Sequence, residues 1–274
     1  AAVHELFLTG LQFDAQLTDA GTNFPPIKVS FPEGELSLVD TGTLAAKQLS
    51  GEVLGVSVDV DLSLTNAMVL RTARKPEPKP LSEKLKLFKT RLAGLAKRRD
   101  FVSFRSKPSF HLQLDGDAKR PGEMKGRAAL RAGGVTMSEG SLEELAIELN
   151  LGDPDGIVGS LRIISLATAT AEIGLATATV NALQSATNAV PERVDFELAL
   201  SQVTVAKAAV ESVQLSGSLT NAGSPPETDE SWAYWAKLAP YVADFSGLAK
   251  GITGEKGLAI HEVSLAGDWR APHL

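Results

Sequence analysis

One phrase of eight residues recurs in this chain of 274 residues, at 3–10, 210–217 and 260–267. Each copy begins with a β-branched residue and a polar pair, continues with two apolar side chains two positions apart, and ends in Gly. Because side chains alternate between the two faces of a strand, this spacing is typical of a strand with one apolar face. A recurring strand phrase indicates a stacked β architecture, in which one unit needs a neighbour to bury that face. The copies are unevenly spaced, so we expect a loose repeat with insertions.

The same alternation runs through much of the chain outside these copies. It is longest at 56–64, where nine residues switch between Val or Leu and Asp or Ser. A helix there would carry Asp and Ser on its apolar stripe, so a strand is favoured. Further strands are expected at 27–31, 110–114, 126–130, 145–151 and 194–200.

Three segments are expected to interrupt these strands with helices, and the first follows a proline-rich linker. Pro76, Pro78 and Pro80 indicate an extended linker, because proline joins neither a helix nor a strand ladder. Apolar residues then recur at spacings of three and four from 81 to 95. This pattern predicts a basic amphipathic helix over 81–99.

The other two expected helices lie in the second half of the chain. The Ala/Thr-rich run at 166–190 fits both a helix and a strand, and we favour a helix because apolar residues keep helical spacing from Ile173 onward and Pro191 supplies a stop. The third helix is expected over 229–250, with a break or kink at Pro240.

Trp232 and Trp235 lie on this third helix in a chain that has only 5% aromatic residues. Such aromatics can anchor a helix that caps an open β core, or they can lie at a membrane interface. The cap is the favoured interpretation.

Composition bounds the class of protein. Hydrophobic residues make up 43% of the chain, enough for a substantial core, and cysteine is absent. The absence of cysteine excludes disulfides, Cys-ligated metals and thiol catalysis, but it fits both a reducing cytosol and a periplasmic protein. No apolar run is long enough for a transmembrane helix. The first residue is Ala rather than Met, and the chain opens directly in one strand phrase and ends in another, so we expect a segment of a longer protein.

Charge is distributed unevenly. The net charge is −6, yet residues 71–107 carry thirteen basic and three acidic side chains, a local balance of +10 that leaves −16 elsewhere. The basic residues on the expected helix are Lys84, Lys86, Lys89, Arg91, Lys97, Arg98 and Arg99. They are candidates for contact with an anionic surface such as lipid headgroups or a partner protein. The simpler interpretation, which we favour, packs the helix on the β block and leaves its lysines solvated. Nucleic acid is disfavoured because the chain is acidic overall.

Nothing in the sequence indicates catalysis. There is no phosphate-binding glycine motif, no His-Glu-x-x-His and no Gly-x-Ser-x-Gly. His4 and His261 occupy equivalent places in two phrase copies, which is explained by a solvent-facing position on a strand. The acidic pairs at 115–117 and 153–155 lack the ligand spacing of a calcium loop and fit turns. We therefore expect no enzyme activity, no cofactor and no metal.

The strand phrases extended to 210–219 and 260–269, the long alternating strands and the absence of catalytic motifs resemble the AsmA-like family of bacterial envelope proteins, related to TamB and YhdP. The segment from Trp232 to Tyr241 also looks like inserts of some members. The resemblance implies a periplasmic protein, held at the inner membrane, whose long curled sheet has an apolar groove that carries phospholipid between the inner and outer membranes. The chain departs from the family in lacking an N-terminal membrane helix and in its expected helical insertions.

The predicted fold is mainly β with helical insertions, built on a long antiparallel curled sheet that forms a groove. We divide the chain into an N-terminal β block (1–74), the linker and basic helix (75–107), a middle β block with the Ala/Thr-rich helix (108–227), and the Trp-containing helix with the last phrase (228–274). These regions are expected to form one continuous structural unit.

The first functional hypothesis is a non-enzymatic segment that binds or conducts phospholipid along the apolar groove. The candidate groove residues, whose role is to desolvate lipid, are Val56, Val58, Val60, Leu62, Leu64, Leu112, Leu114, Leu145, Ile147, Leu149, Phe196, Leu198, Leu200, Val213, Leu215, Val263 and Leu265. The alternative is a structural or adhesive β-repeat protein with a closed core that binds a protein partner. A third hypothesis, an unrecognised hydrolase, would need polar side chains clustered in a pocket.

Overall fold

The computed structural model describes residues 5–15, 18–19, 22–23, 27–39, 42–53, 55–67, 102–153, 156–183, 191–221 and 241–270. Strands contain 85% of these residues. The helical structure among them is limited to two short 3-10 turns, η1 (Pro121–Glu123) and η2 (Glu255–Gly257). The prediction of a mainly β protein is therefore confirmed.

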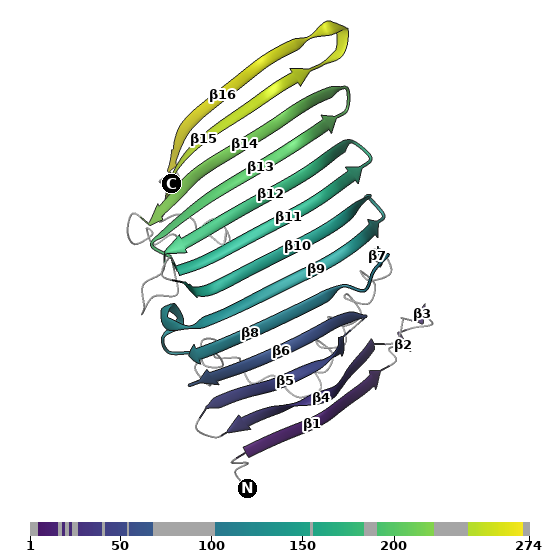
Figure 1. Ribbon diagram of the computed structural model, residues 1–274, viewed down its shortest axis with the longest axis vertical. Coiled ribbons are helices and arrows are strands. Elements are labelled where there is room, and N and C mark those ends of the chain that lie inside the picture. The colour runs from purple at the N-terminus through teal and green to yellow at the C-terminus, as the bar shows by residue number, and fades with distance from the viewer. Residues whose placement is uncertain are drawn as a thin grey trace.

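A single long sheet contains nearly all the strands (Figure 1). In their order across the sheet they are β1 (Glu5–Ala15), β4 (Ile27–Val39), β5 (Thr43–Val53), β6 (Val56–Thr65), β8 (Ser109–Asp117), β9 (Lys125–Met137), β10 (Gly140–Asp153), β11 (Gly156–Thr168), β12 (Ala171–Leu183), β13 (Arg193–Val205), β14 (Ala208–Asn221), β15 (Tyr241–Thr253) and β16 (Ala259–Arg270). The short β7 (Val102–Phe104) pairs with the end of β9, and β2 (Thr18–Asp19) and β3 (Thr22–Asn23) form a separate two-stranded ribbon.

Neighbouring strands are antiparallel, as expected, with one exception among the described strands: β6 and β8 run parallel. The sheet is not closed, and its edges are β1 and β16. Strands from the first, third and fourth regions of the chain belong to this one sheet, with β1 at the N-terminal end and β16 at the far end (Figure 1).

The prediction of a helix at 166–190 is wrong for the described residues of this run. Its first residues complete β11, and residues 171–183 form β12, which pairs along its length with β11 and β13. Alanine favours a helix and threonine favours a strand, so the composition of this run is mixed and the two neighbouring strands decide the outcome. Residues 184–190 lie outside the described part.

The expected helix at 229–250 is wrong over its second half, because β15 begins at Tyr241, directly after Pro240. Residues 229–240 lie outside the described residues, as does the basic helix at 81–99 with its linker at 75–80. The last part of the linker-and-helix region, from Val102, contains the strand β7.

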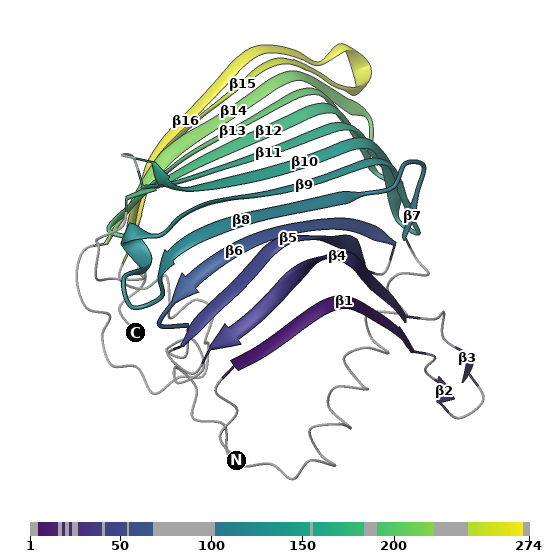
Figure 2. The ribbon, with the colours of Figure 1, turned by 60° about the horizontal axis from the view of Figure 1, so that its bottom comes forward.

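The strands from β9 to β16 share a crease. On every second strand one residue takes a left-handed backbone conformation, namely Gly134 (φ 59°), Ser165 (φ 53°), Gln202 (φ 54°) and Gly251 (φ 62°). The register between strands continues unchanged on both sides of these residues, so they form one row across the sheet. Figure 2 shows the strands arching rather than lying flat.

At the crease, apolar residues on a strand are three positions apart instead of two. Ala132 and Val135 on β9 are an example, and both lie in one buried cluster with Leu142, against which Leu145 packs. Residues on either side of the crease therefore touch each other, which places the apolar face on the inside of the bend. The two residues between each apolar pair belong to the outer face.

On the outer face, a long polar side chain lies over a glycine of the neighbouring strand. A Cβ at Gly174 would overlap the Gln202 amide, and a Cβ at Gly251 would come within 2.8 Å of the Glu211 Cβ. Gly251 also has a positive φ, which glycine adopts without steric cost. These glycines make room for the bend.

The first strands carry a separate crease, at Gly10, Gly34 and Gln48. It is out of line with the second, because Leu49 is in register with Val60, Leu112 and Ala128, whereas β9 bends later, at Gly134. The parallel pair β6–β8 thus joins two subsheets whose bends are offset.

Both ends of this parallel junction are fastened by hydrogen bonds. At one end the Ser57 backbone N–H donates to the Pro108 carbonyl at 2.9 Å. At the other end the Asn66 Nδ2 donates to Asp117 Oδ1 at 2.8 Å, and Asp117 also accepts from the Lys119 backbone N–H at 2.9 Å. These two hydrogen bonds lower the pKa of Asp117, with the Lys119 N–H as the larger cause.

The positive φ of Ser165 at the crease leads to a prediction about stability. Ser165→Val should destabilise the protein by about 1–2 kcal/mol, because a β-branched residue resists positive φ. Ser165→Gly should cost less, since glycine accepts this conformation although the hydrogen bond to Glu143 is lost. The matched control is Ser160→Val, at an exposed outer position of the same strand. Urea unfolding measures all three. Equal losses for the two valine variants would contradict the crease.

The lowered pKa of Asp117 at the parallel junction predicts that the stability of the fold depends on pH. A depressed folded-state pKa means that Asp117 stabilises the fold above its unfolded pKa of about 3.9, and that this contribution disappears as the pH falls through the folded value. Asp117→Ala should therefore lower the melting temperature at pH 7, and the difference from wild type should shrink below about pH 4. Asp115→Ala on the same strand is the control. A difference that does not change with pH would argue against the carboxylate role.

Candidate functional site: an apolar sheet face

Register places all the candidate groove residues on one face of the sheet. Val58 is beside Phe110, which is beside Leu130, and Leu130 is beside Ile147. Because residues directly opposite each other on paired strands point to the same side, these links transfer the face from strand to strand. They reach from Val56 on β6 to Leu265 on β16, and we call this surface the apolar face.

The apolar face consists of parallel rows that cross the sheet. One row contains Val58, Phe110, Leu130, Ile147, Leu161, Ala178, Leu198, Leu215, Gly247 and Leu265. The row beside it contains Val60, Leu112, Ala128, Leu149, Gly159, Val180, Phe196, Gly217, Phe245 and Gly267. Apolar residues that alternate along each strand are thus joined by strand pairing into rows that cross the strands at right angles.

Large and small residues alternate where the aromatic side chains lie. Phe196, Gly217, Phe245 and Gly267 are neighbours on four successive strands. A Cβ at Gly217 would lie 2.8 Å from the Phe196 Cζ, and one at Gly267 would lie 3.1 Å from the Phe245 Cζ. Each ring therefore occupies the space that its glycine neighbour leaves.

No charged residue occupies a position of the apolar face in the described strands from β5 to β16. The outer face is the opposite. There Glu148 accepts from Arg131 at 2.8 Å and from Arg127 at 3.0 Å. The hydrogen bond from Arg131 and the charge of Arg127 lower the pKa of Glu148. The sheet thus separates an uncharged side from a charged one.

Exposure changes along the apolar face. Val135, beside the crease, is only 5% exposed, whereas Ile147 and Val180, farther along the strands, are 39% and 40% exposed. Large apolar side chains are usually buried in soluble proteins, so a run of such values is informative. The other sheet among the described strands is the two-stranded ribbon of β2 and β3, which is separate from the long sheet.

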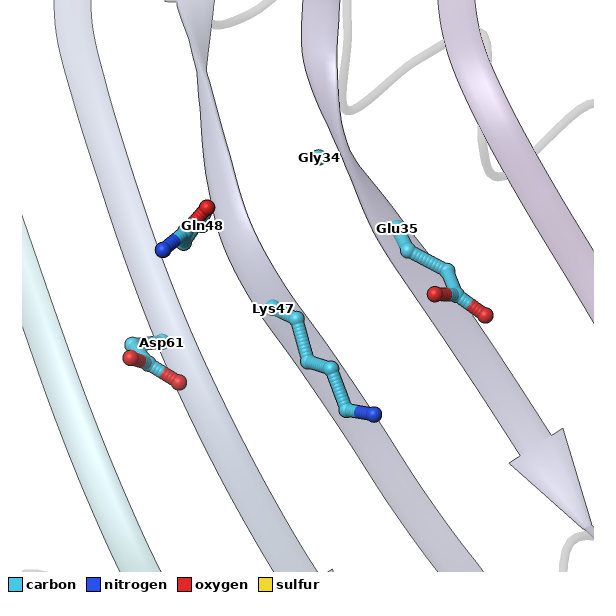
Figure 3. A pocket seen from close by; sticks show the side chains of 5 residues that line it. All are labelled: Gly34, Glu35, Lys47, Gln48 and Asp61. Atoms are coloured by element: carbon cyan, nitrogen blue, oxygen red, sulfur yellow. The ribbon is translucent and has the colours of Figure 1, made fainter.

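A separate hollow lies on the outer face of the first subsheet, beside the crease of β4 and β5. It has a volume of about 490 Å³ and is lined by Gly34, Glu35, Lys47, Gln48 and Asp61. Figure 3 shows their arrangement on three neighbouring strands. Its lining mixes both signs of charge, and it is open to solvent, so it offers no enclosed site for a ligand.

The other candidate residues from the sequence either lie on the outer face or at strand ends, or lie outside the described residues. His261 is an exposed outer residue at the crease of β16, and Asp115 and Asp117 end β8 before a turn. Among the described residues, no three His, Asp or Glu side chains lie close enough together to hold a metal ion. The basic residues from Lys84 to Arg99 lie outside the described part of the chain.

Within the described residues, no helix has the length and apolar character needed to cross a bilayer. Comparison of the chain with protein-family models, curated proteins and solved structures found no match of any of the three kinds.

The crease was missed in the sequence, although its signal is there. In the phrase copies Val210 to Val213 and Ile260 to Val263, the polar pair separates two apolar residues by three positions. The same spacing occurs in Leu142 to Leu145 on β10. The polar pair, which we interpreted only as part of a strand phrase, is the place where β14 and β16 bend, whereas β1, which contains most of the first copy, bends at Gly10.

Proposed function

We propose that this chain is a non-enzymatic segment of a bacterial envelope protein that binds or conducts phospholipid along its apolar face. The observation that supports this proposal is the extent of that face. It continues across the strands from β5 to β16 without a charged residue at any described position, while the outer face carries ion pairs.

Desolvation is the physical basis of the proposal. Covering apolar surface is favourable by about 25 cal/mol per Å² removed from water. Acyl chains need no hydrogen-bond partners, so a surface without charged side chains suits them and discriminates poorly among chain types. The bend turns the apolar face to the inside, and Ile147 and Val180, farther along the strands, remain exposed and available to contact an acyl chain.

The proposed setting in the envelope rests on the resemblance to AsmA-like proteins. Their groove-forming curled sheets are the architecture expected from that resemblance, and a long unclosed sheet is compatible with it. Attachment of the basic segment at 81–99 to an anionic membrane surface remains a separate prediction, since that segment lies outside the described residues.

The alternative of a structural or adhesive protein requires a closed core. It is less well supported, because the sheet has two edges and its apolar face is partly exposed to solvent among the described residues. A hydrolase would need clustered polar groups in an enclosed pocket, and the outer hollow at Gly34 does not provide them.

Lipid binding is tested with a matched pair of substitutions on β13. Leu198 lies on the apolar face and Ala199 on the outer face, where its neighbours are the uncharged Thr177 and Gln214. Leu198→Asp should weaken uptake of a fluorescent fatty acid by about tenfold or more, because the acyl chain would have to desolvate a carboxylate. Ala199→Asp should leave uptake unchanged.

Native mass spectrometry of the wild-type protein provides the second readout, and co-purifying phospholipid is the expected result. Circular dichroism confirms that each variant is folded, and Leu198→Ser serves as a milder replacement if the aspartate variant does not fold. No bound phospholipid together with no fatty-acid uptake by wild type, or equal uptake by Leu198→Asp and Ala199→Asp, would refute the proposal.

A further inference from the structure

The rows of the apolar face do not all cross the parallel junction between β6 and β8. Beyond the crease of β9, Val135 is paired with Phe104 of β7, and Met137 is paired with Val102. β6 begins level with Ser109, so it does not extend beside β7, which pairs with β9 alone among the described strands. The rows that continue into the first subsheet therefore lie on the other side of the crease.

Two of the rows that cross the junction carry exposed apolar side chains. On β10, Ile147 and Leu149 are 39% and 37% exposed, and their rows reach β6 through half-buried residues of β9 and β8. We call these two the junction rows. One contains Val58, Phe110, Leu130 and Ile147, and the other contains Val60, Leu112, Ala128 and Leu149. An acyl chain on Ile147 can therefore continue into the first subsheet without leaving the apolar face.

The length of the junction rows between β6 and β10 matches one acyl chain. Three strand spacings of about 4.8 Å separate these two strands, which gives about 14 Å. The acyl chains of one leaflet span half of a hydrocarbon core that is about 30 Å thick, which gives about 15 Å. One chain that begins on the exposed Ile147 therefore also contacts Phe110 on β8 and Val58 on β6.

We propose that an acyl chain bound along the junction rows bridges the parallel pair β6–β8 and holds the two subsheets together. This inference rests on the proposed function. The junction is a place where a ligand has an effect on stability, because parallel pairing is slightly less stable per residue and β8 has only 9 residues, against 13 in β9 and 14 in β10. A ligand that contacts both sides binds the joined state and not the separated one, so it stabilises the junction by mass action.

Hydrogen exchange of the full chain, with oleate as the ligand, tests this coupling. At an oleate concentration of about one hundred times its dissociation constant, amide exchange in β6 and β8 should slow by up to about a hundredfold, because opening of the junction then requires release of the ligand. Leu112→Glu should remove this slowing. Gln113→Glu, which places the same side chain on the outer face between Asp61 and Arg127, should retain it. Ile147→Glu, at a 39% exposed position, replaces Leu112→Glu if that variant does not fold.

The position of the acyl chain is tested with a fatty acid that carries a photoreactive diazirine, followed by peptide mass spectrometry. Labels are expected both on β6 or β8 and on β10. Labels confined to the strands from β9 to β16, or equal slowing of exchange in Leu112→Glu and Gln113→Glu, would overturn the bridge and leave the proposed function intact. Oleate uptake without any slowing in β6 and β8 would have the same meaning. No uptake of oleate by wild type would overturn both.

Discussion

The continuous hydrogen-bonded ladder from β9 to β16 constrains everything else in this structure. When paired strands keep one register, a change in the alternation of side chains on one strand must be matched on its neighbour. A bend at Gly134 therefore requires a bend at Glu143, at Ser165 and at each following strand. The result is a crease that turns a two-faced sheet into one with an inner and an outer side, and the apolar rows follow it without interruption.

The parallel pair of β6 and β8 lies between the two creases. The first crease ends at β5, whose register with β6 shifts between Ala46 and Leu49, and the second begins at Gly134, beyond the residues of β9 that pair with β8. The creases of Gln48 and Gly134 can therefore be offset while the apolar face passes through the junction in register, from Val60 to Leu112. Hydrogen bonds at both ends, such as Asn66 to Asp117, hold this junction together.

Alternation predicted the strands and the membership of the apolar face from sequence, because a period of two is a local property of the backbone. Local information was insufficient for the run at 166–190, because alanine favours a helix and threonine favours a strand. Pairing with β11 and β13 decided the outcome for residues 171–183. The order of strands and the parallel junction depend on pairing between distant segments. The crease has a signal in the sequence, namely the three-residue spacing between Leu142 and Leu145. One such break in the alternation does not identify a bend by itself; the bend becomes evident when the strand register aligns it with the same break on neighbouring strands.

The sheet is unclosed, and its apolar face lacks charged residues. These are separate properties, and the proposed function depends on both. A closed sheet would bury its apolar side chains against each other, so an uncharged face would need no ligand. Here Ile147 and Val180 remain more than a third exposed although they belong to uninterrupted apolar rows. A sheet that merely supported an outer binding surface would tolerate polar residues at such exposed places. Their absence over so many strands supports the proposal of an apolar occupant that extends along the rows.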